Sequence, residues 1–240
     1  MGTGNWSTRA AVVARWFGVT RDDLSRATTS SNASIPWMSL SPGKIVLITG
    51  ASGAGKSTLL RHIRRAHCRD RGRRWIELGG IRFRDWPVID VVVDALGGRR
   101  DERAIVEGLE SLSRVGLSEV WTYLRKPREL SEGQRWRLRL AVALARARAG
   151  PADGLCVIAC DEFCAALDRV TALVVARALR RAVDAHSNLR AVVATGHEDL
   201  VPVLSPDTIV RCDFGEYEVI EDVKCRKLSA NVGKGGDGSI

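Results

Sequence analysis

One short stretch of the sequence could bind phosphate. Residues 50–57 read GASGAGKS, which fits the pattern G-x-x-x-x-G-K-S/T. The apolar run GKIVLIT precedes it and an expected helix, residues 56–69, follows it, which is the context that this motif needs. The glycines let backbone N–H groups turn toward phosphates, and the start of the helix adds a positive dipole. The residues predicted to bind the nucleotide are Gly50, Ala51, Ser52, Gly53, Ala54, Gly55, Lys56, Ser57 and Thr58.

Metal and catalytic roles can be assigned to side chains in this loop and in a second motif. Lys56 is expected to reach the β- and γ-phosphates, and Ser57 to offer a hydroxyl to the Mg²⁺ ion that bridges them. About a hundred residues on, LCVIACDE places an apolar run directly before Asp161 and Glu162. Asp161 would hold the Mg²⁺ through its water shell, and Glu162 could polarise the water that attacks the γ-phosphate. Taken without the phosphate loop, an acidic pair here could equally mark a buried strand returning to solvent.

Residues 130–134 carry a third motif, LSEGQ. It resembles the LSGGQ signature of the ATP-binding cassette (ABC) ATPases and departs from it only at Glu132. The same residues could form a helix start with Ser131 as its N-cap, and the two interpretations are compatible. The resemblance implies that the signature residues Ser131, Gly133 and Gln134 bind the γ-phosphate side of an ATP held by a second subunit. It also implies that the protein closes as a homodimer on ATP.

Two further motifs continue the resemblance in the family's order. ALD, residues 166–168, matches the D-loop with Asp168, and TGHED carries His197 as the switch histidine. His197 would contact the γ-phosphate and the attacking water, so the expected catalytic residues are Glu162, His197 and Lys56. The similarity covers about residues 35–220. It implies an α/β fold of the P-loop NTPase type and a magnesium-dependent ATPase with ATP and Mg²⁺ as cofactors.

The sequence departs from the family at one functional position. ABC ATPases have a glutamine between the phosphate loop and the signature, and the only glutamine of this chain is Gln134 of the signature itself. Glu77 and Asp85 are weak candidates to replace it. The aromatic residue that would stack on adenine is also unassigned, because Trp16 and Trp37 lie upstream at positions that point to no role.

The chain divides into an extension, a main domain and a tail. Residues 1–34 read as helix followed by the polar linker SRATTSSNAS, residues 35–222 as the ATPase domain, and residues 223–240 as a flexible tail. Within the domain, strand-like runs alternate with amphipathic helices, which predicts a mainly parallel sheet with flanking helices. Helical spacing throughout about 87–150 predicts a compact helical subdomain.

Composition limits the possible partners and location. No apolar run reaches the roughly 18 residues that a membrane span requires, and the N-terminus lacks the features of a secretory signal, so we expect a cytoplasmic protein. Six scattered cysteines without a C-x-x-C pair predict reduced, structural thiols. The net charge of +9 allows nucleic acid as a partner. The arginines of RHIRRAHCRDRGRR could form a polyanion contact or a solvated surface.

Three functions are compatible with these motifs. The first, which we favour at this point, is a non-transport ATPase that acts on a partner protein or nucleic acid, because the glutamine region that grips a permease is altered. The alternative is the ATP-binding subunit of an ABC transporter whose membrane protein is a separate chain. A nucleic-acid-binding module without turnover is a third reading, and Glu162 and His197 argue against it.

Overall fold

We analysed a computed structural model of the chain, which describes residues 7–18, 20, 43–69, 73–150, 154–213 and 216–221. In the extension, α1 spans Thr8–Trp16, and the Ser7 side chain caps it by accepting a hydrogen bond from the Ala10 N–H. The predicted linker at 25–34, the tail at 223–240 and both expected domain boundaries lie outside the described residues.

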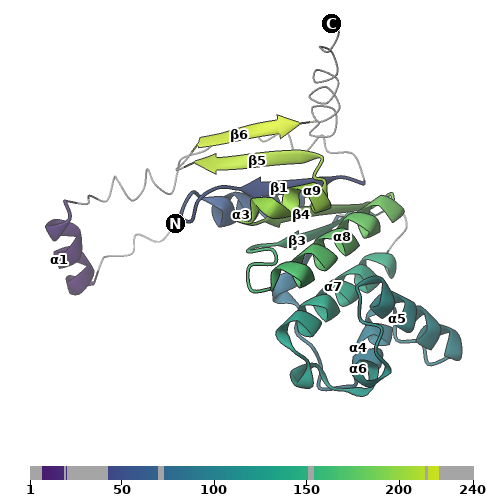
Figure 1. Cartoon of the computed structure of the whole chain (residues 1–240). Helices are drawn as coiled ribbons and strands as arrows, with labels where there is room; N and C mark the ends of the chain where they lie inside the picture. The colour runs from purple at the N-terminus through teal and green to yellow at the C-terminus, as the bar shows by residue number, and fades with distance from the viewer. Residues whose placement is uncertain are drawn as a thin grey trace, which may run out of the picture.

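The described residues form a six-stranded sheet with the order β2-β3-β4-β1-β5-β6 (Figure 1). The first five strands in this order are parallel, and β6 runs antiparallel to β5. This confirms the predicted mainly parallel sheet. Because parallel strands point the same way, the loops that follow β1, β3 and β4 meet at one edge. The strands are β1 Ile45–Thr49, β2 Arg74–Glu77, β3 Cys156–Cys160, β4 Leu189–Ala194, β5 Thr208–Asp213 and β6 Glu216–Glu221.

Helices cover both faces of the sheet, which explains why the inner strands are apolar along their whole length. On one face, α3, Lys56–His67, buries Leu59 and Ile63 against side chains of β1 such as Ile48. On the other face, α7, Glu132–Arg148, and α8, Arg169–Ala185, join Ile45 and Leu47 in the larger core. The short α9, Val201–Leu204, and the 3₁₀ turn Glu198–Leu200 lead from β4 toward β5.

Helices also fill the stretch where a helical subdomain was expected. It contains α4, Val88–Ala95, α5, Glu102–Arg114, and α6, Val120–Leu124, followed by α7, with a 3₁₀ turn at Pro127–Glu129. Another 3₁₀ turn, Leu78–Gly80, follows β2 and precedes this stretch. The N-terminus of α5 is capped by Asp101, whose carboxylate accepts the Ala104 N–H at 2.8 Å. Helices α4 and α5 pack closely at Gly108, which has no side chain. A Cβ at this position would lie only 3.0 Å from both Ile89 Cδ1 and Val93 Cγ2 of α4.

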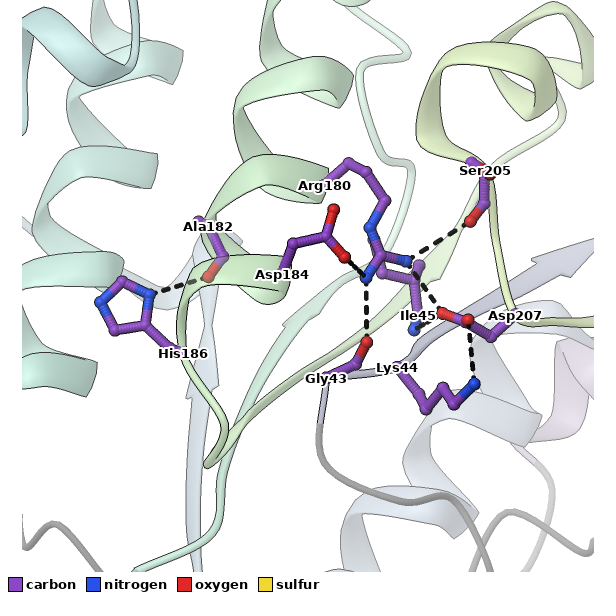
Figure 2. A network of polar contacts seen from close by, with 9 residues as sticks. All are labelled: Gly43, Lys44, Ile45, Arg180, Ala182, Asp184, His186, Ser205 and Asp207. Atoms are coloured by element: carbon purple, nitrogen blue, oxygen red, sulfur yellow. Dashed lines mark hydrogen bonds and ion pairs between the residues drawn. The ribbon is translucent and has the colours of Figure 1, made fainter.

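A buried ionic network ties the amino-terminal ends of β1 and β5 to α8 (Figure 2). The Arg180 guanidinium donates to Asp207 Oδ2 at 2.8 Å and to the Gly43 carbonyl at 2.9 Å. Asp207 also accepts the Ile45 N–H at 2.9 Å and pairs with Lys44 at 3.2 Å. Burial disfavours the Asp207 carboxylate, but the bond from Ile45 and the Arg180 contacts outweigh it and lower the Asp207 pKa. The network lies at the sheet edge opposite the loops described next.

Candidate nucleotide-binding site

The loop between β1 and α3 depends on glycine at defined positions. Gly50, Gly53 and Gly55 have φ angles of +140°, +82° and +98°, which side-chain-bearing residues rarely adopt. A Cβ on Gly50 would lie 2.2 Å from the Cys212 carbonyl oxygen of β5. The backbone therefore turns tightly over the end of β5, and the N–H groups at the start of α3 open toward the loop.

Lys56 lies across this loop. Its Nζ donates to the carbonyl oxygens of Gly50 and Ala51, each at 2.7 Å. The ammonium group is thus held within the loop that would surround the phosphates, where a point charge can bind several anionic oxygens.

The acidic pair follows β3 with an unusual backbone. Glu162 has φ +51°, a left-handed conformation that costs free energy for a residue with a side chain. Its N–H donates to Asp161 Oδ1 at 3.1 Å, and the next N–H, that of Phe163, donates to the Ala194 carbonyl at 2.7 Å. Phe163 is fully buried and meets Trp136 edge to face at 5.4 Å. This packing holds Glu162 in its strained conformation at the sheet edge.

The loop after β4 brings in the histidine. The Thr195 N–H donates to the Ile48 carbonyl of β1 at 3.0 Å, and Thr195 Oγ1 accepts the His197 N–H at 3.1 Å. His197 Nδ1 lies 4.0 Å from Asp199 Oδ1. Asp199 in turn pairs with Arg169 at the start of α8, so the His197 loop is tied to the helix that follows the D-loop.

These loops line one cavity of about 620 Å³. It brings together eight of the nine predicted loop residues, the acidic pair and His197; Ala54 is buried beneath it. Three more residues line the cavity without an assigned role: Thr195 and Gly196 belong to the TGHED motif beside His197, and Ala165 directly precedes the D-loop residues 166–168. The residues that line it are Gly50, Ala51, Ser52, Gly53, Gly55, Lys56, Ser57, Thr58, Asp161, Glu162, Ala165, Thr195, Gly196 and His197.

The signature lies outside this cavity. Ser131 and Gln134 form a reciprocal cap at the start of α7, with Ser131 Oγ accepting the Gln134 N–H at 3.2 Å and Gln134 Oε1 accepting the Ser131 N–H at 3.0 Å. A Cβ on Gly133 would lie 3.3 Å from Thr171 Cγ2, so the starts of α7 and α8 adjoin. Asp168 caps α8, and hydrogen bonds from Thr171 lower the pKa of its carboxyl. Neither Ser131, Gly133, Gln134 nor Asp168 lines the cavity of its own chain.

The candidates for the missing glutamine are engaged elsewhere. Glu77 at the end of β2 pairs with Arg64 at 2.8 Å, and Asp85 pairs with Lys126 at 3.0 Å and with Arg128 at 3.3 Å. Neither carboxylate lines the cavity. Of the upstream aromatic residues, Trp16 is exposed on α1 and Trp37 lies outside the described residues.

One aromatic residue that the sequence did not single out lies beside the loop. The Tyr217 hydroxyl of β6 is 3.8 Å from the position that a Cβ on Gly55 would take. It borders the loop on the side of β5 and β6, whereas Asp161 and His197 come from the side of β3 and β4. The sequence could have pointed to Tyr217 only if residues 216–221 had been recognised as a strand that lies near the loop.

The cavity's oxygen donors suit a magnesium ion. The Ser57 hydroxyl and the Asp161 carboxylate both line it, and Mg²⁺ prefers few protein oxygens with water and phosphate completing its octahedron. Within the described residues there is no cluster of three or more His, Cys, Asp or Glu side chains that would form an all-protein metal site. Burial, reinforced by Asp161, raises the pKa of the Cys160 thiol to about 12, so this thiol is neutral beside the acidic pair.

Comparison with known proteins agrees with this arrangement. Residues 36–149 match the family model described as ABC transporter. The chain is 31% identical over 200 residues to the lipoprotein-releasing system ATP-binding protein LolD of Granulibacter bethesdensis, covering 72% of this chain and 83% of LolD. It is 30% identical over 176 residues to the phosphonates import ATP-binding protein PhnC of Rhizobium johnstonii, covering 60% of each.

Solved structures share the fold. The ATP-binding cassette MJ0796, in a dimeric post-hydrolysis state bound to ADP and phosphate, superposes with a TM-score of 0.57 at 22% identity, covering 75% of this chain and 86% of that one. CbiO1 of Clostridium perfringens, part of an ABC transporter complex, gives 0.58 at 20% identity, with 80% and 82% covered. Together with the family match and the LolD similarity, this fold establishes that the chain belongs to the ATP-binding cassette family and is an ABC-type ATPase of the P-loop NTPase superfamily.

Proposed function

We propose that the chain is the ATP-binding, ATP-hydrolysing subunit of a transporter whose membrane-spanning protein is a separate chain. The observation that carries this proposal is the similarity to LolD over 72% of the chain, together with similarities to import ATP-binding proteins. These relatives favour the transporter alternative over the non-transport ATPase that the altered glutamine region had suggested, and they offer no support for a nucleic-acid partner. Within the described residues, no helix is long and apolar enough to cross a membrane.

The residues of the cavity would divide the work of hydrolysis. Lys56 and the loop N–H groups bind the β- and γ-phosphates, while Ser57 and Asp161 hold Mg²⁺, which neutralises charge on the phosphate oxygens when bound. Glu162, which lines the cavity directly after Asp161, accepts a proton from the attacking water. His197, which follows the neighbouring strand β4, donates to the γ-phosphate.

The expected position of the adenine ring follows from the positions of these phosphate-binding and catalytic residues. The γ-phosphate must face Asp161, Glu162 and His197, which follow β3 and β4 on one side of the loop. The other end of the nucleotide then extends toward β5 and β6. Tyr217 lies there beside Gly55, and we assign it the contact with adenine that no upstream tryptophan clearly supplies.

A second subunit would complete the site. The signature residues lie at the exposed start of α7, with Ser131 and Gly133 outside their own cavity. A helix start of this kind attracts phosphate, and the dimeric structure of MJ0796 shows that cassettes of this fold can pair. The proposed dimer holds ATP between the loop of one chain and the signature of the other.

Helix α6 offers a surface for the membrane protein. Three of its five residues, Val120, Trp121 and Leu124, are apolar with 64%, 75% and 62% of their surface exposed. Apolar groups gathered in this way on a short helix indicate a contact that another protein covers. We therefore place the permease contact at α6.

Co-purification from detergent-solubilised membranes of the source cell tests this role. The affinity-tagged chain should retain a multi-spanning membrane protein, and Trp121→Ser should lose it while keeping ATP hydrolysis. Trp16→Ser, which changes an equally exposed tryptophan on α1, is the matched control. If no membrane protein is retained and DNA or RNA stimulates the ATPase, the non-transport function is the correct one.

A further inference from the structure

A groove runs along the outer side of α8, away from the nucleotide cavity. Two cavities of about 460 and 330 Å³ adjoin there and share Arg114, Ala178 and Arg181 in their walls. The first is lined by α8, α9 and the end of α5, and the second by α5, α7 and α8. Figure 1 shows α5, α7 and α8 as neighbours on the same side of the sheet. None of the groove's residues lines the nucleotide cavity.

The floor of this groove is apolar. Val170, Val174, Ala178 and Ala182 recur every fourth residue of α8 and therefore form one stripe along the helix. Val170 is 72% exposed and Val174 is 41% exposed, although both line a hollow rather than a convex surface. A concave apolar stripe of this length is suited to the apolar face of another helix.

The walls of the groove are strongly basic. Arg114, Arg148, Arg177 and Arg181 all line it. In the part of the chain that the structure describes, no acidic side chain pairs with Arg148, Arg177 or Arg181, and Arg114 has only an exposed pair with Glu110 at 3.3 Å. Arg180 of the same helix differs, since it points inward and both of its terminal guanidinium nitrogens donate within the buried network (Figure 2). Arg148, Arg177 and Arg181 therefore present positive charge that no acidic side chain of the described residues pairs with.

We propose that this groove binds an amphipathic helix of a partner protein whose apolar face is flanked by glutamate or aspartate. Its apolar side chains cover the stripe on α8, and its carboxylates pair with Arg177 and Arg181, which are one helical turn apart. A nucleic acid would satisfy the arginines but leave the apolar floor exposed. A second copy of the chain docking through the same groove would bring like charges together. The proposal does not depend on the transporter role.

Synthetic peptides provide a direct test with the full 240-residue chain. The probe is a helical peptide of about 18 residues with leucines on one face and glutamates beside them, and its control replaces each glutamate by glutamine. Fluorescence anisotropy at low salt should show the glutamate peptide binding at least about tenfold more tightly. Equal affinity for the two peptides, or binding of neither, would overturn the proposal.

Variants locate the binding in the groove. Arg177→Glu with Arg181→Glu, and separately Val174→Asp, should each weaken the glutamate peptide at least about tenfold while ATP hydrolysis and circular dichroism stay unchanged. Arg65→Glu with Arg69→Glu is the matched control, because these exposed arginines of the α3 segment have the same spacing outside the groove. The proposal fails if the control weakens binding equally. It also fails if phosphatidylglycerol vesicles or duplex DNA bind through Arg177 and Arg181 more tightly than the peptide does.

Discussion

At the scale of single residues, glycine determines the conformation of the loop between β1 and α3. The glycines of the motif provide the positive φ angles, and the clash that a Cβ on Gly50 would make with Cys212 shows why the first position must remain glycine. Another contributor could not be found from such a motif. Tyr217 of β6 lies beside the loop although the two segments are far apart in the sequence, and no short pattern records such a neighbour.

Lys56→Ala should reduce ATP affinity at least about a hundredfold, because it removes the ammonium group held inside the loop. Calorimetric titration with Mg-ATP measures this loss. The fold should persist, because Lys56 bonds only to the loop's own carbonyls. Arg65→Ala, an exposed change on the same helix, should leave ATP affinity unaltered. Unchanged affinity in the Lys56 variant would exclude the phosphate role of this residue.

Tyr217→Ala should weaken ATP binding about tenfold, since stacking of a base on an aromatic ring contributes ~1–3 kcal/mol. Tyr217→Phe keeps the ring and should retain ATP affinity. Inorganic tripolyphosphate has no base and should bind all three proteins equally. A parallel loss of tripolyphosphate affinity in the alanine variant would mean that Tyr217 supports the loop and does not contact adenine.

At the scale of elements, the best predictions came from long, strongly patterned segments. The helix expected from Lys56 to about Arg69 ends at His67, and the helices α5, α7 and α8 lie in the amphipathic stretches that predicted them. Strands β5 and β6 were not predicted. The sequence of β6, EYEVIE, does carry a strand signal in its alternation and in Tyr217, Val219 and Ile220, but the segment is short and pairs with β5 alone at the edge of the sheet.

The buried pair between α8 and β5 should be important for stability. Arg180→Met leaves the Asp207 carboxylate buried without its main cation and should lower the free energy of unfolding by about 3–5 kcal/mol. Arg181→Met, the neighbouring exposed arginine, should change it by less than about 0.5 kcal/mol. Urea denaturation measures both variants, and equal stability of the two would contradict the role of the network.

The same pair predicts a pH dependence. The pKa of Asp207 in the folded protein lies below its ordinary value of 3.8, so the side chain loses its proton at a lower pH in the folded protein than in the unfolded chain. The resulting stabilisation is complete above the unfolded pKa and is lost as the pH falls through the folded pKa. Asp207→Asn lacks this titration. The difference in unfolding free energy between the parent and this variant should therefore shrink as the pH is lowered from about 5 toward 3, and a constant difference would refute the assignment.

At the scale of the whole molecule, the proposed site needs two chains. The cavity holds the loop, the acidic pair and His197, while the signature at the start of α7 lies outside it. The motifs are read one by one from the sequence, whereas the distance between the signature and the cavity of its own chain is seen only in the fold. The choice of partner is harder still to predict, because an altered glutamine region is one local change, whereas a permease would contact a surface such as α6.

Hydrolysis should accordingly require two chains. Glu162→Gln preserves the size of the side chain but removes its basicity, so ATP should still bind while turnover falls by about 10²–10⁴. With Mg-ATP, size-exclusion chromatography should show this variant as a stable dimer, and with Mg-ADP as a monomer.

A second substitution separates dimer formation from ATP binding. Adding Ser131→Arg to Glu162→Gln places a bulky side chain at the exposed signature, where it would block the γ-phosphate of the opposite chain. The double variant should bind ATP yet elute as a monomer. Adding Arg135→Ala instead, four residues further along α7, changes a side chain that does not line the cavity and should leave the dimer intact. A Glu162→Gln protein that remains monomeric with ATP and hydrolyses it at the parental rate would disprove the shared site, because neither the proton acceptor nor the second signature would then be needed.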